Sequence, residues 1–321
     1  MDKIKLFSTQ KNIISKSIID NNFDFIGSTY DTLKHNTRLN YSDKITNLAI
    51  DKYGLAIKTN PTTFLKGNNI EQLELKELST FKEQFEDSLK INTDNCQLTG
   101  FDYNINLSTQ YPPVSYLQAF RSLPKYTQSI YPYGKGLSYI NQCKTFNVYD
   151  KIKQLEKQNI IIPSHYLNSN LLRMELQVKQ KMKQTKELTN INTLKDLLNN
   201  QNYLSVINQF QKTFNNIHKQ PLTRYADMVQ PNPNEINSTD FALIYYINEI
   251  GMDSYINLLE QEKNMKLISY RQYKVRKDKA MNLWYKYSLI NKDSSHDLLN
   301  ELQTKYNDKI EATKQIILSH V

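Results

Sequence analysis

A change in the spacing of apolar residues divides this chain in two and does most to limit the folds open to it. Up to about residue 178, several segments alternate polar and apolar residues, as half-buried strands do. After about residue 188, apolar residues recur only at helical spacing. The sequence therefore predicts an α+β domain over 1–188, with a mostly antiparallel sheet and packed helices, and an all-helical region over 189–321.

Individual elements can be assigned from the same spacing. The expected strands are 3–7, 53–58, 98–107, 134–140, 145–149 and 170–179. The expected helices are 70–89, 114–123, 152–158, 194–200, 203–216, 241–251, 253–264, 270–290 and 295–319. Asp240, Asp253 and Ser269 are the expected N-caps of three of them, because short polar side chains accept hydrogen bonds from the free N–H groups at a helix start.

The charge balance favours a polyanionic partner. The net charge is +9, which points to nucleic acid first and to a membrane surface second. The 22 Tyr are interleaved with Lys, and this mixture suits stacking on bases and contact with phosphates. An AT-rich genome would produce the same composition, so that explanation stays open.

Several classes of protein are disfavoured. The chain has neither a G-x-x-x-x-G-K-[ST] nor a G-x-G-x-x-G motif, which argues against a nucleotide-driven motor. Its two Cys and five His form no zinc pattern. No apolar run approaches the roughly 20 residues of a membrane span, and the first residues lack the apolar core of a signal peptide. We expect a cytoplasmic protein with no membrane partner.

Oxygen-bearing side chains gather in two of the expected strands. Asp102 and Asn104 are two residues apart, so they share a strand face, and their oxygens suit a hard cation such as Mg²⁺ or Mn²⁺. Arg173 and Glu175 have the same spacing, and Arg173 is a candidate DNA contact. If the two strands are neighbours, Glu175 adds a second carboxylate to the metal site.

A tyrosine in a third strand offers a nucleophile. Tyr149 and Lys151 share a face if the strand continues that far. A tyrosine hydroxyl with a pKa of about 10 attacks poorly at neutral pH. A nearby ammonium would favour the phenolate, and a divalent ion would polarise a phosphoryl group. The loop at 58–69 adds donors for phosphate, namely Lys58, Lys66, Asn68 and Asn69.

Spacing alone does not select this chemistry. A tyrosine in a strand is usually a core residue, and a carboxylate on a strand is usually an ion-pair partner. The pair Arg173 and Glu175 would also fit a cross-strand ion pair with no further role.

Four motifs in order resemble those of the filamentous-phage gene II replication initiators and related phage and plasmid rolling-circle initiators. Residues 53–70 are similar to that family's strand, Pro turn and K-x-L-x-G-x-N loop. Residues 100–105 resemble its R-I-D strand, 145–156 its catalytic segment, and 172–178 its R-F-E strand. The resemblance covers about residues 1–185.

The resemblance implies a site-specific endonuclease and ligase that nicks one DNA strand at a replication origin. The nucleophilic tyrosine carries over to Tyr149 and its neighbouring lysine to Lys151. The implied products are a 5′-phosphotyrosyl link and a free 3′ hydroxyl, with a host helicase and polymerase as further partners.

The chain departs from the family at three positions. Ala56 stands where some members carry Glu, Asn68 where some carry His, and Gly100 where the family has Arg. The expected metal ligands Asp102, Asn104 and Glu175 therefore rest on chemistry, not on a motif. The departures also motivate an alternative, a DNA-binding replication regulator without catalysis. A relaxase or transposase with the same tyrosine chemistry is a further alternative.

The helical region contains a basic segment. Residues 265–287 hold seven Lys and Arg against one Asp, which leaves +6. We expect DNA contacts there, and 253–264 with 269–287 could form a helix-turn-helix. A solvated basic face is the alternative. The candidate contact residues are Arg271, Lys274, Arg276, Lys277 and Lys279.

Overall fold

Ten strands form one sheet in the order β2-β3-β4-β5-β1-β6-β10-β9-β8-β7, and each of its nine pairings is antiparallel. This computed structural model describes the chain except residues 11–12, 32–35, 44, 133–135, 180–185, 220–236, 289–291 and 320–321. The strands are β1 (Lys3–Ser8), β2 (Asp24–Asp31), β3 (Asn36–Ser42), β4 (Asn47–Asp51), β5 (Gly54–Thr59), β6 (Gln97–Ser108), β7 (Thr127–Ile130), β8 (Gly136–Ile140), β9 (Lys144–Asp150) and β10 (Leu171–Val178).

Helices follow the strands in the second half of the chain, so the expected α+β class with an antiparallel sheet is confirmed. Within the described ranges, no helix is long and apolar enough to cross a membrane. The helices are α1 (Lys16–Asn22), α2 (Pro61–Lys66), α3 (Leu75–Leu89), α4 (Pro113–Leu117), α5 (Lys151–Lys157), α6 (Leu194–Leu198), α7 (Asn200–Asn215), α8 (Ser238–Ile250), α9 (Met252–Asn264), α10 (Tyr270–Ser288) and α11 (Lys292–Leu318).

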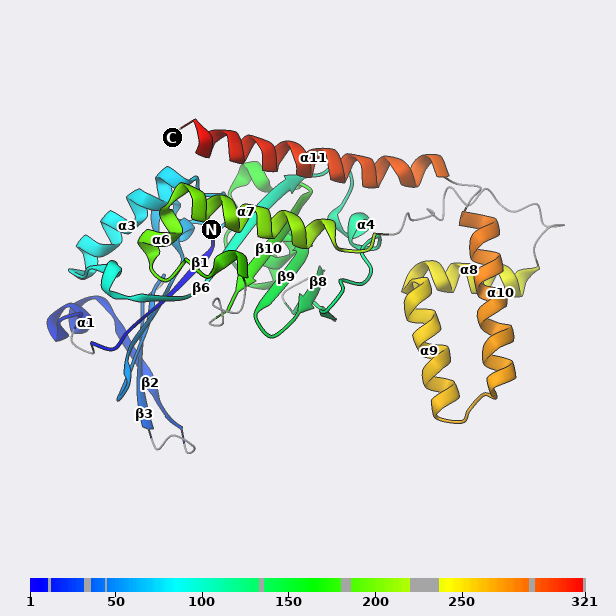
Figure 1. Ribbon diagram of the computed structural model, residues 1–321, viewed down its shortest axis with the longest axis horizontal. Helices are drawn as coiled ribbons and strands as arrows, with labels where there is room; N and C mark the ends of the chain where they lie inside the picture. Colours follow the sequence, from blue (N-terminus) through cyan, green and yellow to red (C-terminus); the bar gives the residue numbers. More distant parts are fainter. Residues whose placement is uncertain are drawn as a thin grey trace.

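The sheet has an apolar face and a polar face, and the central strand β6 contributes side chains to both. Phe101, Tyr103 and Ile105 point to the apolar face, because alternate residues of a strand point to opposite sides. Asp102 and Asn104 point to the polar face. Helices α3, α6, α7 and α11 pack on the apolar face, and Figure 1 shows α11 extending along the sheet beside α7.

Aromatic rings join the sheet to the helices that follow it in sequence. Phe210 of α7 contacts Tyr103 of β6 and Phe146 of β9, with ring centroids 5.0 and 5.3 Å apart. Phe214 of α7 stacks on Tyr306 of α11 at 3.9 Å. One hydrophobic core therefore spans the expected boundary at 188/189. The amphipathic helices beyond it cover the apolar face, which would otherwise be exposed to water.

A separate small core lies within α8, α9 and α10. Met252 clusters with Trp284 at one end of the α9–α10 pair, and Leu259 clusters with Tyr273 at the other. The two helices thus pack antiparallel along their length, whereas the helices of a helix-turn-helix cross at roughly 90–120°. Figure 1 shows these three helices as a group of their own.

The expected N-caps met different outcomes. Ser269 Oγ accepts a hydrogen bond from the Gln272 N–H at 3.2 Å, so this cap is confirmed. The cap of α8 is Asn237, whose side chain accepts from the Asp240 N–H, so the assignment of Asp240 was wrong. The N-cap of α9 is Gly251 and Asp253 lies within the helix, so the assignment of Asp253 was also wrong.

Strands β2, β3 and β4 were not expected from the sequence. They form the outer end of the sheet, where Phe25 and Ile26 are 58% and 61% exposed. Apolar residues do alternate in β3, at Leu39 and Tyr41, and in β4, at Leu48 and Ile50, so the signal for these two strands was present in the sequence and was overlooked.

Candidate active site

Three neighbouring strands bring the expected site residues together on the polar face of the sheet. Glu175 of β10 lies opposite Asn104 of β6 on one side and Asn147 of β9 on the other. Gln177 of β10 lies opposite Asp102 of β6. Tyr149 of β9 lies opposite Arg173 of β10, so three of the four segments singled out in the sequence meet at one place.

Tyr149 points to the polar face and makes a hydrogen bond to a carboxylate. Its hydroxyl donates to Glu175 Oε2 at 3.0 Å. Its ring stacks on Tyr131, with centroids 4.1 Å apart and planes inclined by 7°, and only 2% of Tyr149 is exposed. Burial raises the pKa of Tyr149 well above its usual value, and the charge of Glu175 raises it further. The hydroxyl is therefore protonated, with a proton acceptor in place.

Amide side chains hold the Glu175 carboxylate. Gln177 Nε2 donates to Glu175 Oε1 at 2.5 Å, and Asn147 Nδ2 donates to the same oxygen at 3.4 Å. Asn147 is itself paired with the Ser138 hydroxyl at 2.8 Å. This network leaves Oε2 to Tyr149 and fixes the orientation of the carboxylate.

Asp102 and Asn104 lie beside this network. Burial raises the pKa of Asp102 to about 7, and the negative charge of Glu175 adds to the effect. Lys3 Nζ lies 3.7 Å from Asp102 Oδ2. Both polar atoms of the buried Asn104 amide lack a hydrogen-bond partner among the described residues. Two neighbouring carboxylates and an unsatisfied amide oxygen are a chemically suitable place for a hard cation.

These carboxylate and amide oxygens suit Mg²⁺ better than a metal whose ligands all come from the protein. Among the described residues, no three His, Cys, Asp or Glu side chains come close enough to hold an ion by themselves. Mg²⁺ usually binds through one or two carboxylates together with water and substrate phosphates, so a full protein cage is not required.

Lys151 lies close to the site but does not share a strand face with Tyr149. Strand β9 ends at Asp150, whose side chain accepts from the Lys153 N–H and begins α5. Lys151 Nζ donates to Asn69 Oδ1 at 3.1 Å and to Gln154 Oε1 at 2.8 Å. Burial lowers the pKa of Lys151 well below its usual value, and the charge of Arg173 lowers it further. Lys151 therefore holds its proton, and with it the positive charge, less firmly than the sequence led us to expect.

A cavity of about 360 Å³ opens onto the pair of Tyr149 and Glu175, whereas Asp102 and Asn104 do not line it. Tyr149, Lys151 and Glu175 all line it, together with Lys3 and Asn69. Its volume lies within the roughly 300–1,000 Å³ typical of sites for small ligands. We refer to it as the site cavity.

Arg173 has a structural position, which corrects its assignment as a DNA contact. Its side chain is completely buried and pairs with Asp2. Its Nε donates to Asn106 Oδ1 at 2.6 Å, and one terminal nitrogen donates to the carbonyls of Asn69 and Ile70 at 2.7 and 2.9 Å. Arg173 thus ties the loop after α2 to the sheet, and its complete burial keeps it away from a phosphate on the surface.

The other expected DNA contacts of this domain differ in their surroundings. Lys66 pairs with Glu71 at 3.2 Å and Glu77 at 2.8 Å, which commits it to the protein. Asn68 Oδ1 accepts from the Ile70 N–H at 3.0 Å and shapes the loop. Lys58 is exposed on the polar face of the sheet.

The basic helix α10 is partly neutralised within its own bundle. Arg276 pairs with Glu262 at 3.2 Å, Lys279 pairs with Asp240, and Lys277 lies over the Tyr273 ring. Arg271 and Lys274 are exposed on the same helix. The described part of the bundle contributes no residue to the lining of the site cavity.

Comparison with known proteins adds no assignment, because neither a family model nor a curated protein sequence matches the chain. Some site residues were missed at the level of sequence. Asn147 precedes Tyr149 by two residues and Gln177 follows Glu175 by two, so the same spacing rule would have placed both on the polar face. Lys3 and Tyr131 carry no such signal, since they reach the site only through the register of β1 and the stacking of the ring on Tyr149.

Proposed function

We propose that this protein cleaves and rejoins one DNA strand by transesterification at Tyr149, as an initiator of rolling-circle replication does. The observation that carries the proposal is the Tyr149 hydroxyl held 3.0 Å from the Glu175 carboxylate at the edge of the site cavity. A nucleophile with its proton acceptor already in place is the usual preparation for covalent catalysis.

The reaction balances without any other reactant than DNA and water. Tyr149 Oη attacks a phosphorus atom, and its proton passes to Glu175 Oε2. The bond from phosphorus to the O3′ of the preceding nucleotide breaks, and that oxygen takes up a proton from solvent. One phosphoester replaces another, so the reverse reaction can rejoin the strand. Lys3 and Lys151 line the cavity. Lys3 would oppose the negative charge of the phosphate, and Lys151 Nζ would donate a hydrogen bond to it.

Further partners follow from the products of this reaction. The free 3′ hydroxyl would prime a host polymerase, and a host helicase would open the duplex ahead of it. Both partners, and a place of action in the cytoplasm of a host cell, belong to the proposal.

A divalent cation, Mg²⁺ or Mn²⁺, forms part of the proposal. Asp102, Asn104 and Glu175 would hold it, and when bound it would polarise the phosphoryl oxygens. We expect millimolar Mg²⁺ to raise the melting temperature of metal-free protein, since a ligand that binds only the folded state stabilises it. Asp102→Asn should remove this shift. Asp87→Asn, on the exposed end of α3, should retain it. Equal shifts in both variants would contradict this metal site.

The burial of Tyr149 favours a second candidate function. With only 2% of the residue exposed and Tyr131 stacked on its ring, a phosphodiester reaches the hydroxyl only through the site cavity or after Tyr131 moves. A DNA-binding replication regulator without catalysis would need no such access.

One experiment separates the two candidates. The full chain is incubated with Mg²⁺ or Mn²⁺ and with DNA of the replicon that carries its gene, both supercoiled and single-stranded. Covalent protein–DNA adducts are separated under denaturing conditions, and the linked peptide is sequenced. We expect the linkage at Tyr149. A linkage at another tyrosine would contradict the site, and DNA binding without any adduct would favour the regulator.

A further inference from the structure

The site cavity is one end of a longer depression on the polar face of the sheet. It shares Lys3, Asn60 and Asn69 with a second depression of about 560 Å³. The second shares Asn47 and Lys58 with a third of about 710 Å³. Shared lining residues make the three contiguous, and we refer to them together as the sheet groove.

The sheet groove crosses most of the sheet. Its lining runs from β8 through β9, β10, β6, β1, β5, β4 and β3 to β2. This path covers eight steps between neighbouring strands, and at about 4.8 Å a step it is roughly 38 Å long. It is too long for a single small ligand and has the proportions of an extended chain.

Cations line the middle of the sheet groove. Lys5 of β1 lies directly opposite Lys58 of β5, and Lys3 lies one pleat further along β1. Like charges directly opposite one another destabilise a sheet. The charges of Lys3 and Lys5 also lower the pKa of Lys58, after the larger effect of the partial burial of its side chain against the sheet. A bound anion would neutralise this cluster of lysines and remove their mutual repulsion.

Few acidic groups compensate these cations. Within the described ranges, no carboxylate forms an ion pair with Lys5, Lys58 or Arg38, all of which line the outer depression. Asp51 lines it too, but its carboxylate accepts hydrogen bonds from the N–H groups of Tyr53 and Gly54. The described lining of the outer depression therefore carries three cations against one carboxylate, and that of the second, middle depression carries Lys3 and Lys58 without a carboxylate.

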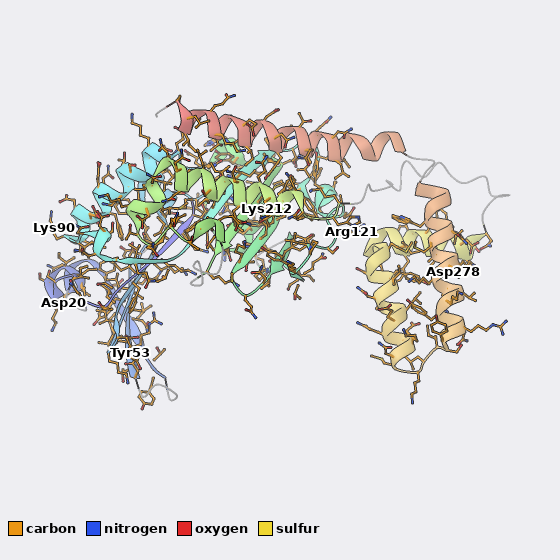
Figure 2. The ribbon with its side chains drawn as sticks, viewed as in Figure 1. Asp20, Tyr53, Lys90, Arg121, Lys212 and Asp278 are labelled. Carbon is orange, nitrogen blue, oxygen red and sulfur yellow. The ribbon has the colours of Figure 1, made fainter. Side chains whose placement is uncertain are left out.

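Ring surfaces accompany the cations at the outer end. Phe7 and Tyr53 line the outer depression, and Tyr53 is 50% exposed. Figure 2 places Tyr53 on the part of the sheet that extends away from the helices. Exposed rings beside cations are the pattern by which proteins bind unpaired bases and the phosphates that join them.

We infer that the sheet groove binds an extended single strand of nucleic acid, with Lys3, Lys5, Lys58 and Arg38 on its phosphates and Tyr53 stacked on a base at the outer end. Bases inside a duplex are stacked on each other and cannot pack on a protein ring. The groove leads to Tyr149, so the inference rests on the proposed function for what happens there, while the binding itself does not depend on it.

The test is an affinity measurement on full-length protein carrying Tyr149→Phe, in which no covalent trapping can occur. The probe is a fluorescently labelled thymidine oligonucleotide of about 12 nucleotides, within the range of single-strand site sizes. Lys5→Gln with Lys58→Gln should weaken binding about tenfold at low salt. The slope of log K against log salt should become shallower by about 1.4, or about 0.7 for each phosphate that no longer has a lysine beside it. Tyr53→Ala should weaken binding about fivefold or more.

A matched control removes the same charge from the opposite face. Lys76 of α3 and Lys195 of α6 are exposed on helices that cover the apolar face, and replacing both with Gln should leave binding unchanged. Melting temperatures should show that all variants fold, and the Lys5 and Lys58 variant should be at least as stable as its parent because the opposed charges are gone.

Three outcomes would overturn the inference. They are equal affinity of the groove and control variants, equal competition by a duplex of the same sequence, and no measurable binding of the single strand. Failure of the proposed function looks different. If binding depends on the groove but the parent protein forms no adduct, the proposed transesterase activity is wrong and the single-strand groove stands. If an adduct forms at Tyr149 but the groove variants bind normally, the proposed activity stands and the groove inference is wrong.

Discussion

Replacing Tyr149 with phenylalanine should abolish covalent attachment to DNA and leave the fold intact. The substitution removes the hydroxyl that donates to Glu175 and preserves the ring that stacks on Tyr131. Glu175 keeps its two amide donors, so we expect a change in stability of about 1 kcal/mol, the usual net value of one hydrogen bond. The measurements are adduct yield under denaturing conditions and urea unfolding.

Two further variants make this result specific. Tyr139→Phe removes another buried hydroxyl, one that donates to a backbone carbonyl on the apolar side of β8, and should leave adduct yield unchanged. Glu175→Gln keeps the shape of the side chain but cannot take up the proton. Adduct formation should then slow by about 10²–10⁴-fold, the usual contribution of a general base. Undiminished adduct from Tyr149→Phe would rule out this residue as the nucleophile.

Replacing Arg173 with methionine should destabilise the protein by about 3–5 kcal/mol, the usual cost of removing one partner from a buried ion pair. Arg173 is fully buried, and its loss would leave the Asp2 carboxylate without its partner. The carbonyls of Asn69 and Ile70 would lose their donor too. The measurement is the free energy of unfolding in urea.

A second substitution separates the charge from the packing. In the double variant Arg173→Met with Asp2→Asn, the uncompensated charge is gone, so part of the stability should return. The stability of Arg173→Lys should lie between that of the parent protein and that of Arg173→Met, because lysine keeps the charge and loses the forked hydrogen bonds. A loss below about 1 kcal/mol for Arg173→Met would mean that water replaces its partners, contrary to its complete burial.

The central strands could be predicted from sequence, and their register could not. Alternation placed Asp102 and Asn104 on one face of β6, and Arg173 and Glu175 on one face of β10. It could not show that Glu175 would lie opposite Asn104, because strand pairing depends on segments distant in sequence. Lys3 was missed for the same reason.

Local signals were also available and not fully used. Asp150 is a good N-cap, and this alone would have ended the strand before Lys151. The spacing of Arg173 and Glu175 placed both on one face but gave no information on burial. Only the tertiary structure shows that the Asn69–Ile70 loop covers Arg173 and leaves Glu175 facing the cavity.

The helices after residue 188 were largely foreseen, but not what they pack against. Periodicity shows that a helix has an apolar face and gives no information on the surface that covers it. In α7 and α11 that face covers the sheet, through contacts such as Phe210 with Tyr103. In α9 and α10 it is buried within the bundle, around Trp284 and Tyr273.

The position of α11 on the sheet has a consequence for how the chain is made. Its residues Leu302, Tyr306 and Ile310 are completely or almost completely buried in the core that carries the site. The bundle of α8–α10 lies between α7 and α11 in sequence, so a ribosome completes that bundle before it makes the helix that finishes the core. Part of the apolar face of the nascent sheet therefore stays exposed until α11 has been synthesised. Any product terminated before α11 would remain in that state, prone to aggregation and degradation.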